Sequence, residues 1–545
     1  MTANQPSEPV QSFPPPRRAV LNSENDITNQ LLDDICGNRL DSLVINYEFS
    51  VLSDAVHIDW ETGELWLNHK NPFRLANDIS PLESIDFEII LTPAVKSLAG
   101  AFADCRNLRR ICLRSLGNVT DLRYMFYKAE SFNQDLESWD TSLVTDMSHM
   151  FDGASSFNGR IGGWNVSRVK SFASMFTKAH SFNQPLDSWD TSNVKDMGSM
   201  FAEARMFNQP LEKWNTSNVT DMNGMFSTAS AFNQPLEKWN TSNVTDMNGM
   251  FYYARVFNQP LEKWDTSNVS DMSSMFAEAR MFNQPLEKWN TSNVTQMYCM
   301  FESAEKFNQP LAGWDTSNVT MMYRMFAHAR MFNQPLDSWD TSNVTDMSSM
   351  FWGAQTFDQP LEKWNTSNVT NMNEMFCAAK KFNQPLEKWT TSNVTDMNGM
   401  FYYARVFNQP LEKWDTSNVT DMSGMFKNAE KFNQPLEKWN TSNVTNMRLM
   451  FKNAASFNGK VSNWDVSKVE DMSGMFAHCD SFDQSIDGWN VSSVKSLSNM
   501  LFGAVSFSHA IGSLLKTARE SGADTRNILG SAVNCPDRNS CPEDD

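Results

Sequence analysis

Side chains that could do acid–base or metal chemistry are scattered along this 545-residue chain. Its histidines fall mostly at unrelated places, and only His328 and His478 share a place in the repeat described below, six repeats apart. The other five are His57, His69, His149, His180 and His509. No HExxH, paired CxxC, Walker or GxGxxG motif occurs. Because a catalytic site needs unlike residues that converge at one place, we expect a protein that is not an enzyme and needs no metal or cofactor.

The eight cysteines do not recur at a regular spacing, as those of a disulfide framework would, which favours a reducing compartment. Cys535 and Cys541 could close a small loop in the acidic tail if they were oxidised. The first residues lack the apolar run of a signal peptide, and no apolar stretch is long enough to span a membrane. These observations predict a cytoplasmic protein.

The net charge of −19 makes some partners improbable. Basic stripes are absent, so neither nucleic acid nor an anionic membrane surface is an expected partner. The acidity itself is explained by solubility.

Tryptophan is the residue whose spacing is most regular. Fifteen tryptophans run from Trp139 to Trp489, each 25 residues from the next, and only Trp60, Trp66 and Trp352 lie outside the series. Such a series could stack on sugar rings at the surface, or its members could stack on one another in a core. We favour the core, because fifteen exposed indoles would form a large sticky patch. In the following turn Leu514 takes the tryptophan place, which predicts a closing repeat.

With the tryptophan at position 0, the unit reads W-[DN]-T-S-N-V-T-D-M-x-x-M-F-x-x-A-x-x-F-N-Q-P-L-E-K. Apolar positions 5, 8, 12 and 15 make one face of a helix, and the threonine at position 6 is a plausible N-cap. The segment "NQPLEKW" is expected to be a short strand, and "DTSN" a turn. The sequence therefore predicts an α/β solenoid with right-handed crossovers, one short parallel strand and one short helix per 25-residue repeat.

The string "FNQPLEKWNTSNVTDMNGMF", residues 232–251, resembles the 25-residue mycoplasma-lipoprotein-type repeat of the BspA-type leucine-rich-repeat surface proteins. The resemblance covers about residues 95–510. It implies a leucine-rich-repeat-like solenoid and often display and adhesion at the cell surface, or secretion.

Four segments follow along the chain. Residues 1–23 are expected to be disordered, 24–90 to form an N-terminal cap or small leading domain, 91–515 to form the solenoid, and 516–545 to form a C-terminal cap and flexible acidic tail. Within the cap we expect a helix over 24–40 and strands in 41–49, 55–61 and 63–69.

The polar constants of the unit have mainly structural roles. The Asn and Gln of "FNQP" and the Asn of "TSNV" are expected to form amide ladders that satisfy backbone groups. The Glu–Lys pair of "LEKW" is the candidate binding surface on the sheet face, with residues Glu212, Lys213, Glu237, Lys238, Glu262 and Lys263. The leading interpretation is a repeat protein that binds a protein partner or mediates adhesion. A carbohydrate-binding protein with exposed aromatic strips and an intracellular scaffold are the alternatives.

Overall fold

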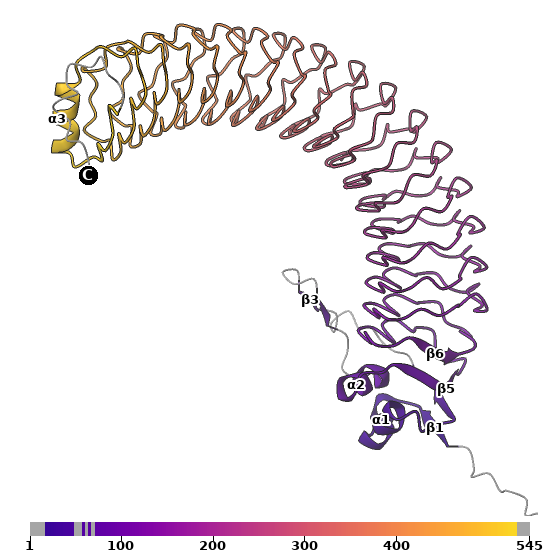
Figure 1. The fold of residues 1–545 in the computed structure, drawn as a ribbon. Helices are drawn as coiled ribbons and strands as arrows, with labels where there is room; N and C mark the ends of the chain where they lie inside the picture. The colour runs from indigo at the N-terminus through magenta and orange to yellow at the C-terminus, as the bar shows by residue number, and fades with distance from the viewer. Residues whose placement is uncertain (1–16, 48–56, 60–63, 67–70, 531–545) are drawn as a thin grey trace, which may run out of the picture. The chain divides into compact units, whose positions relative to one another are not determined.

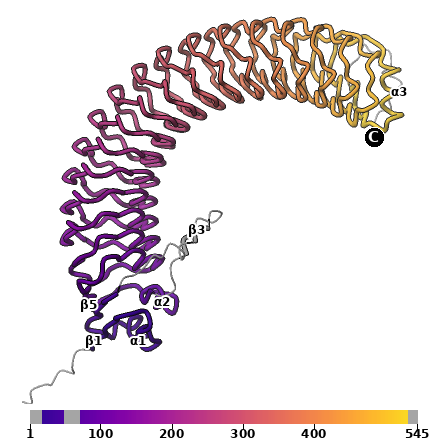
Figure 2. The backbone as a smooth tube through the Cα atoms, turned by 180° about the vertical axis from the view of Figure 1, so that it is seen from behind, coloured from indigo at the N-terminus to yellow at the C-terminus, as the bar shows by residue number. Residues whose placement is uncertain are grey.

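The computed structural model describes residues 17–47, 57–59, 64–66 and 71–530, which fall into two compact units. The first comprises the chain up to residue 194 with 203–209, and the second comprises 195–202 with the chain from 210 onward. Each unit is built mainly from turns of chain that stack side by side with a period of 25 residues (Figure 1 and Figure 2). The chain is a repeat solenoid, as its periodicity predicts.

The first unit opens with a small sheet and two helices. The sheet has four parallel strands, β1 (Arg18–Leu21), β2 (Ser42–Ile45), β5 (Ser84–Leu91) and β6 (Arg110–Leu113), in that spatial order. The remaining elements are a 3₁₀ turn η1 (Glu24–Asp26), helices α1 (Asn29–Cys36) and α2 (Pro72–Ile79), and an antiparallel pair β3 (His57–Asp59) and β4 (Glu64–Trp66). Helices α1 and α2 pack against each other.

Asn71 begins α2 and ties it to the first turn of the solenoid. Its side-chain oxygen accepts hydrogen bonds from the backbone N–H groups of Phe73 and Arg74, which is the usual role of an N-cap. Its amide also donates to the carbonyl of Ala101 at 3.0 Å. The segment 71–79 has no counterpart among the expected elements, whereas α1, β2, β3 and β4 lie where a helix and strands are expected.

Part of the segment expected to be disordered is ordered. Within residues 1–23, residues 18–21 form β1, because this stretch pairs in parallel with β2 and Leu21 is buried beneath it. Residues 1–16 lie outside the described residues.

The prediction of a short helix in each repeat is wrong. Between residues 114 and 511, all of which are described, the chain forms no helix. In the segment that begins at Met222, alternate N–H groups close tight turns, from Met225 to Met222 at 3.2 Å and from Ala229 to Phe226 at 3.1 Å. The N–H groups between them bond to the next repeat instead, as from Gly224 to the carbonyl of Asn248 at 2.8 Å.

Backbone conformation explains why no helix forms. Positions 10 and 14 of the unit lie in the left-handed region in every repeat, as at Gly224 with φ of 58° and Thr228 with φ of 59°. A left-handed residue every fourth place ends a right-handed helix before it completes a turn. The threonine at position 6 is likewise no N-cap, since the hydroxyl of Thr245 donates to the carbonyl of Thr220, one repeat earlier.

The parallel pairing lies elsewhere than expected. Single parallel bridges join position 7 of successive repeats, as between Asp246 and Asp271, so the pairing falls inside the segment expected to be a helix. The segment expected to be a strand, "NQPLEKW", is not one. There, side-chain amides replace backbone pairing: the Asn258 side-chain oxygen accepts from the N–H of Asn283 at 2.9 Å and from the Gln284 amide at 3.0 Å. The expected amide ladders are confirmed.

The tryptophans form the core. All fifteen of the regular series are 2–5% exposed, and neighbouring rings such as Trp264 and Trp289 stack with centroids 6.3 Å apart. The indole N–H groups are satisfied inside the stack, as where Trp239 donates to the carbonyl of Leu211 and Trp289 to the carbonyl of Leu261, each at 3.0 Å. The core interpretation is confirmed, and the alternative of sugar binding by a strip of exposed tryptophans is wrong because these rings are buried.

Helix α3 (Gly512–Glu520) lies near the end of the second unit, and beyond it Asp524 forms a last parallel bridge with Ser496. Leu514, in the tryptophan place, is fully buried, and Leu515 and Ala518 cover the last turn beside it. The closing repeat is confirmed.

Candidate interaction surface

Six positions of the unit, 9, 10, 13, 14, 16 and 17, differ from repeat to repeat, while the others stay nearly constant. The constant positions hold the core and the ladders between repeats. Positions 9, 10 and 13 follow the parallel bridge at position 7, and in successive repeats of each unit they lie side by side on a surface that we call the variable face. Most of its members are partly exposed, whereas Ser273 and small residues such as Ala277 and Ala327 are buried.

The aspartate at position 7 fixes the start of this face. In Asp246, one carboxylate oxygen accepts a hydrogen bond from the backbone N–H of Asn248 at 2.8 Å, which holds position 9 in a tight turn. Burial first, and then the charges of Asp221 and Asp271, raise the pKa of Asp246 above its ordinary value, although the bond from Asn248 opposes this. The neighbouring carboxylates of Asp221, Asp246 and Asp271 therefore repel one another, and this cost accompanies the turn that positions the variable face in these repeats.

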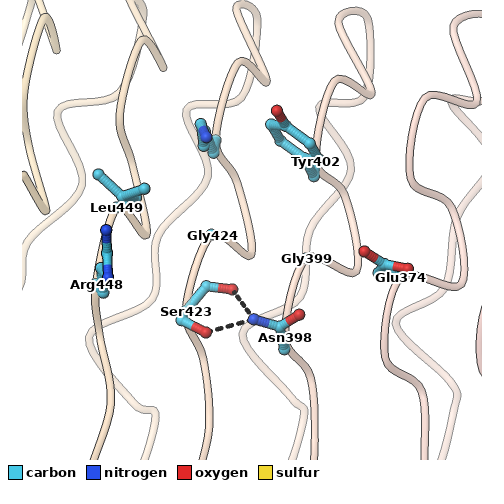
Figure 3. Close-up of a pocket in the computed structure, with 9 residues that line it drawn as sticks. Glu374, Asn398, Gly399, Tyr402, Ser423, Gly424, Arg448 and Leu449 are labelled. Atoms are coloured by element: carbon cyan, nitrogen blue, oxygen red, sulfur yellow. Dashed lines mark hydrogen bonds between the residues drawn. The ribbon is translucent and has the colours of Figure 1, made fainter.

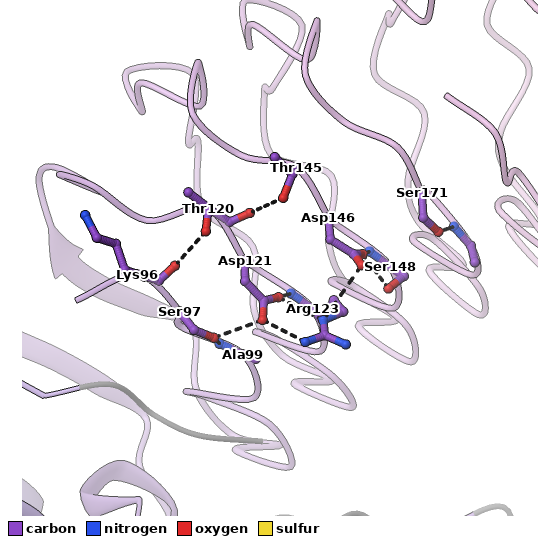
Figure 4. A network of polar contacts seen from close by, with 11 residues as sticks. Lys96, Ser97, Ala99, Thr120, Asp121, Arg123, Thr145, Asp146, Ser148 and Ser171 are labelled. Carbon is purple, nitrogen blue, oxygen red and sulfur yellow. Dashed lines mark hydrogen bonds and ion pairs between the residues drawn. The ribbon is translucent and has the colours of Figure 1, made fainter. Parts of the chain in front are cut away.

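A cation relieves this repulsion at the first turns of the solenoid. Arg123, at position 9, donates to Asp121 at 2.9 Å and lies 3.8 Å from Asp146 (Figure 4). In the same network Thr145 and Thr120 each donate to a carbonyl one repeat earlier (Figure 4). The hydrogen bonds of Thr120 and Thr145 hold neighbouring repeats together, and the positions that follow in each repeat carry the variable side chains.

The variable face of the second unit carries an aromatic cluster, which we define as Tyr298, Glu302, Tyr323, Arg324 and Trp352. Tyr298 and Tyr323 stack with ring centroids 4.7 Å apart and an interplanar angle of 6°. The Arg324 guanidinium lies over the Trp352 ring at 5.3 Å and pairs with Glu302 at 2.8 Å. Burial is the main cause that raises the pKa of Tyr323 to about 12, so its hydroxyl stays protonated at physiological pH. These contacts hold the aromatic side chains in fixed positions.

A second feature of the same face is a pocket with a cavity volume of about 250 Å³ (Figure 3). Its floor includes Gly399 and Gly424, both at position 10, where most other repeats carry side chains. Its walls are Glu374, Asn398, Tyr402, Ser423, Lys427, Arg448 and Leu449.

The Glu–Lys pairs form an ion-pair ladder between repeats. Lys238 pairs with Glu212 at 3.1 Å and Lys263 with Glu237 at 3.2 Å, so each lysine reaches the glutamate one repeat earlier. The lysines are largely exposed. The prediction that these glutamates and lysines lie on a sheet face is wrong. The parallel bridges lie at position 7 and not beside positions 23 and 24. The structure brings these residues together as a neutral stripe.

The Glu–Lys residues that the sequence predicts as a binding surface therefore do not belong to the variable face. The positions written x in the repeat unit indicate the variable face, because they are the positions at which the residue type is not constant. Repeats that agree elsewhere differ there, as in position 13, which is Tyr252, Glu302, Trp352 and Lys427 in four of them.

Side chains that could hold a metal do not gather. Among the described residues, no group of three histidines, cysteines, aspartates or glutamates could hold a metal ion. The six cysteines in the described part of the chain are free thiols, and Cys535 and Cys541 lie outside it. No helix among the described residues has the length and apolar character needed to cross a membrane.

A family model matches most of the solenoid. This model, described as "Mycoplasma protein of unknown function, DUF285", matches five overlapping stretches, 96–205, 184–276, 259–351, 333–436 and 409–514. No curated protein matches the chain. A solved structure titled "Crystal structure of TLR13-ssRNA13 complex" aligns with 77% of this chain and 68% of that chain, at 10% identity and a TM-score of 0.19.

Proposed function

We propose that this chain, which belongs to the family of mycoplasma proteins of unknown function described as DUF285, is a non-enzymatic protein that binds a protein partner on its variable face. The observation that carries the proposal is the division of the repeat into constant positions that build the solenoid and variable positions, of which 9, 10 and 13 form the variable face. Residues 241–269 and 391–419 are identical, the variable positions of one repeat included, whereas most other repeats share the constant positions and differ at the variable ones. What distinguishes one repeat from another lies mainly on the variable face.

The aromatic cluster has the composition of a binding hot spot. Tyrosine, tryptophan and arginine are the residues that most often dominate the energy of protein interfaces. Tyr323 and Arg324 are partly exposed, and stacking and ion pairing already hold them in place. Because little side-chain freedom remains to be lost, binding here costs less entropy than binding by mobile side chains.

Adhesion is the finer role that we propose, on the resemblance to BspA-type surface proteins. An intracellular scaffold would use the same face in another compartment. Immunolabelling of intact and permeabilised cells separates the two, since adhesion requires that the protein be accessible from outside.

The test of partner binding exchanges the cluster for residues that the array already uses. The variant carries Tyr298→Ser, Tyr323→Ser, Arg324→Ser and Glu302→Ala, the residue types found at these positions in the repeat that begins at Trp264. Its matched control carries Lys238→Ala, Lys263→Ala and Lys288→Ala, which remove the exposed lysines of the ion-pair ladder. Both should unfold at temperatures close to that of the wild type.

Proteins captured by each form from extracts of the native cells and of the surfaces they contact are compared by mass spectrometry. We expect a partner that the wild type and the control retain and that the cluster variant loses. Equal capture by the cluster variant, with loss on the lysine control, would place the interface on the Glu–Lys stripe, the surface that we propose as the alternative.

A further inference from the structure

We propose that the pocket over Gly399 and Gly424 binds an acidic peptide segment, with Lys427 and Arg448 receiving a carboxylate of that segment. The proposal rests on the proposed function in assigning the variable face to a protein partner, and it adds the chemistry of what is bound.

Two consecutive repeats carry glycine at position 10 here, as the Gly224 and Gly249 repeats do earlier in the array, and the missing side chains leave room for the pocket. A Cβ added to Gly424 would meet no atom within 4 Å, so the space above it is open. The next repeat has Leu449 at the same position, also in the left-handed region with φ of 56°, and this side chain closes that end of the pocket. The volume of about 250 Å³ suits one or two side chains rather than a cofactor.

The two cations of the pocket, Lys427 and Arg448, have no acidic side chain within 4.0 Å among the described residues. Some cations of the same repeats are paired, as Arg405 is with Glu430 at 3.4 Å and Lys438 with Glu412 at 3.2 Å, whereas Lys431 and Lys452 are not paired with any described residue. Lys427 and Arg448 form no such pair in a chain whose net charge is −19.

The positions of these cations favour an anion between them. Burial first, and then the charges of Lys452 and Arg448, lower the pKa of Lys427. Its ammonium lies over the Tyr402 ring at 4.8 Å, which holds it against the wall of the pocket. A bound carboxylate would offset the repulsion between these cations and would form charge-assisted hydrogen bonds with them.

The opposite end favours a peptide over a free anion. Glu374 lies there and can accept hydrogen bonds from backbone N–H groups, but it would repel a phosphate ion (Figure 3). Asn398 forms a fixed wall between the two ends, since its amide donates to both the carbonyl and the hydroxyl of Ser423 (Figure 3). A segment with a carboxylate at one end and free N–H groups at the other matches this arrangement.

The probe is a fluorescein-labelled hexaglutamate peptide, whose binding to the full chain is followed by fluorescence anisotropy at low ionic strength. We expect saturable binding by the wild type and at least tenfold weaker binding after the double change Lys427→Ala and Arg448→Ser. Gly424→Leu should weaken binding as much, because it fills the pocket with the side chain that position 449 already accommodates. The double change Lys413→Ala and Lys438→Ala removes two cations of the Glu–Lys stripe and should leave binding unchanged.

Three results would overturn the proposal: no binding by the wild type, undiminished binding by both pocket variants, or displacement of the peptide by inorganic phosphate at equal charge concentration. The aromatic-cluster variant separates this proposal from the proposed function. It should bind hexaglutamate as the wild type does, so loss of partner capture and loss of peptide binding are independent results.

Discussion

At the level of single residues, the constant side chains serve the contact between one repeat and the next. Thr216 is buried, and its hydroxyl donates to the carbonyl of Asn240 in the following repeat at 2.9 Å. The Asn268 amide donates to the carbonyl of Ser242 in the preceding repeat at 2.7 Å. Because such a partner is supplied by a neighbouring repeat, no repeat is complete alone.

Truncation of a core tryptophan tests this dependence. Trp289→Ala should destabilise the protein by roughly 3–5 kcal/mol, as large-to-small core substitutions do. Trp352→Ala, on the variable face, is the matched control and should cost clearly less, because that ring is partly exposed. Denaturant unfolding measures both. Native tryptophan emission should be blue-shifted and should move to the red on unfolding, whereas red-shifted native emission would contradict the buried core.

The aspartates at position 7 predict a pH dependence. The raised pKa of Asp246 means that its ionised form disfavours the folded state, so its cost is present at neutral pH and disappears as the pH falls through that pKa. Asp246→Asn keeps the turn, since Asn371 at the same position accepts from the N–H of Asn373 at 3.0 Å. We expect a gain of roughly 0.2–1 kcal/mol at pH 7, the size typical of relieved like-charge pairs, which diminishes toward pH 4.

Unfolding curves at pH 7 and at pH 4 measure the gain in stability of Asp246→Asn, with Asp246→Ala as the control. The control loses the turn hydrogen bond as well as the charge, so it should destabilise the protein. A gain for Asp246→Asn that grew at low pH would have the wrong sign for this explanation.

At the level of elements, the repeat depends on its left-handed residues. Gly249, with φ of 57°, donates its N–H to the carbonyl of Ser273 at 2.8 Å. Gly249→Pro is incompatible with this φ and removes the donor, so it should cost at least about 2 kcal/mol. Gly249→Asn should be tolerated, because Asn499 adopts φ of 58° at the same position.

Thermal unfolding followed by circular dichroism compares the two variants. The same spectra should show little helix in the wild type. A strong helical signal, or equal stability of the proline and asparagine variants, would contradict the turn structure of the repeat.

The sequence predicts the period, the buried tryptophans, the amide ladders and the closing repeat, but it misassigns the segment after position 6. Its apolar residues recur at three- and four-residue intervals, which a helix produces and which consecutive tight turns also produce. The turns need left-handed residues at positions 10 and 14, and many of these are not glycine, as at Glu374 and Leu449. Glycine recurs at position 10 in only some repeats, so composition gives a weak signal. The variable face is not predicted, because the residue types at its positions differ between repeats, whereas the constant Glu–Lys pair is easily recognised.

At the level of the whole molecule, identity between repeats makes the array divisible. Residues 241–269 and 391–419 match throughout, so deletion of residues 255–404 joins Ala254 to Arg405 inside an unchanged local sequence. Each new contact is of a kind that the array already contains, and solenoid stability is approximately a sum of repeat and neighbour terms. The shortened protein should therefore fold with the same spectra per residue.

The deletion also separates the two proposed surfaces. It removes the aromatic cluster, which lies between residues 298 and 352. It keeps Lys427 and Arg448, and the Tyr252 repeat supplies the wall that Tyr402 forms in the full chain. Binding of hexaglutamate should persist, although Glu374 is replaced by Gly224 at the far end of the pocket.

The most direct test of the division between a common skeleton and a variable face is the affinity of the deletion protein for the partner that the wild type captures. We expect this affinity to be lost while circular dichroism and cooperative unfolding show an intact solenoid. A folded deletion protein that binds the partner as tightly as the full chain would contradict it, because binding would then reside in the constant residues that all repeats share.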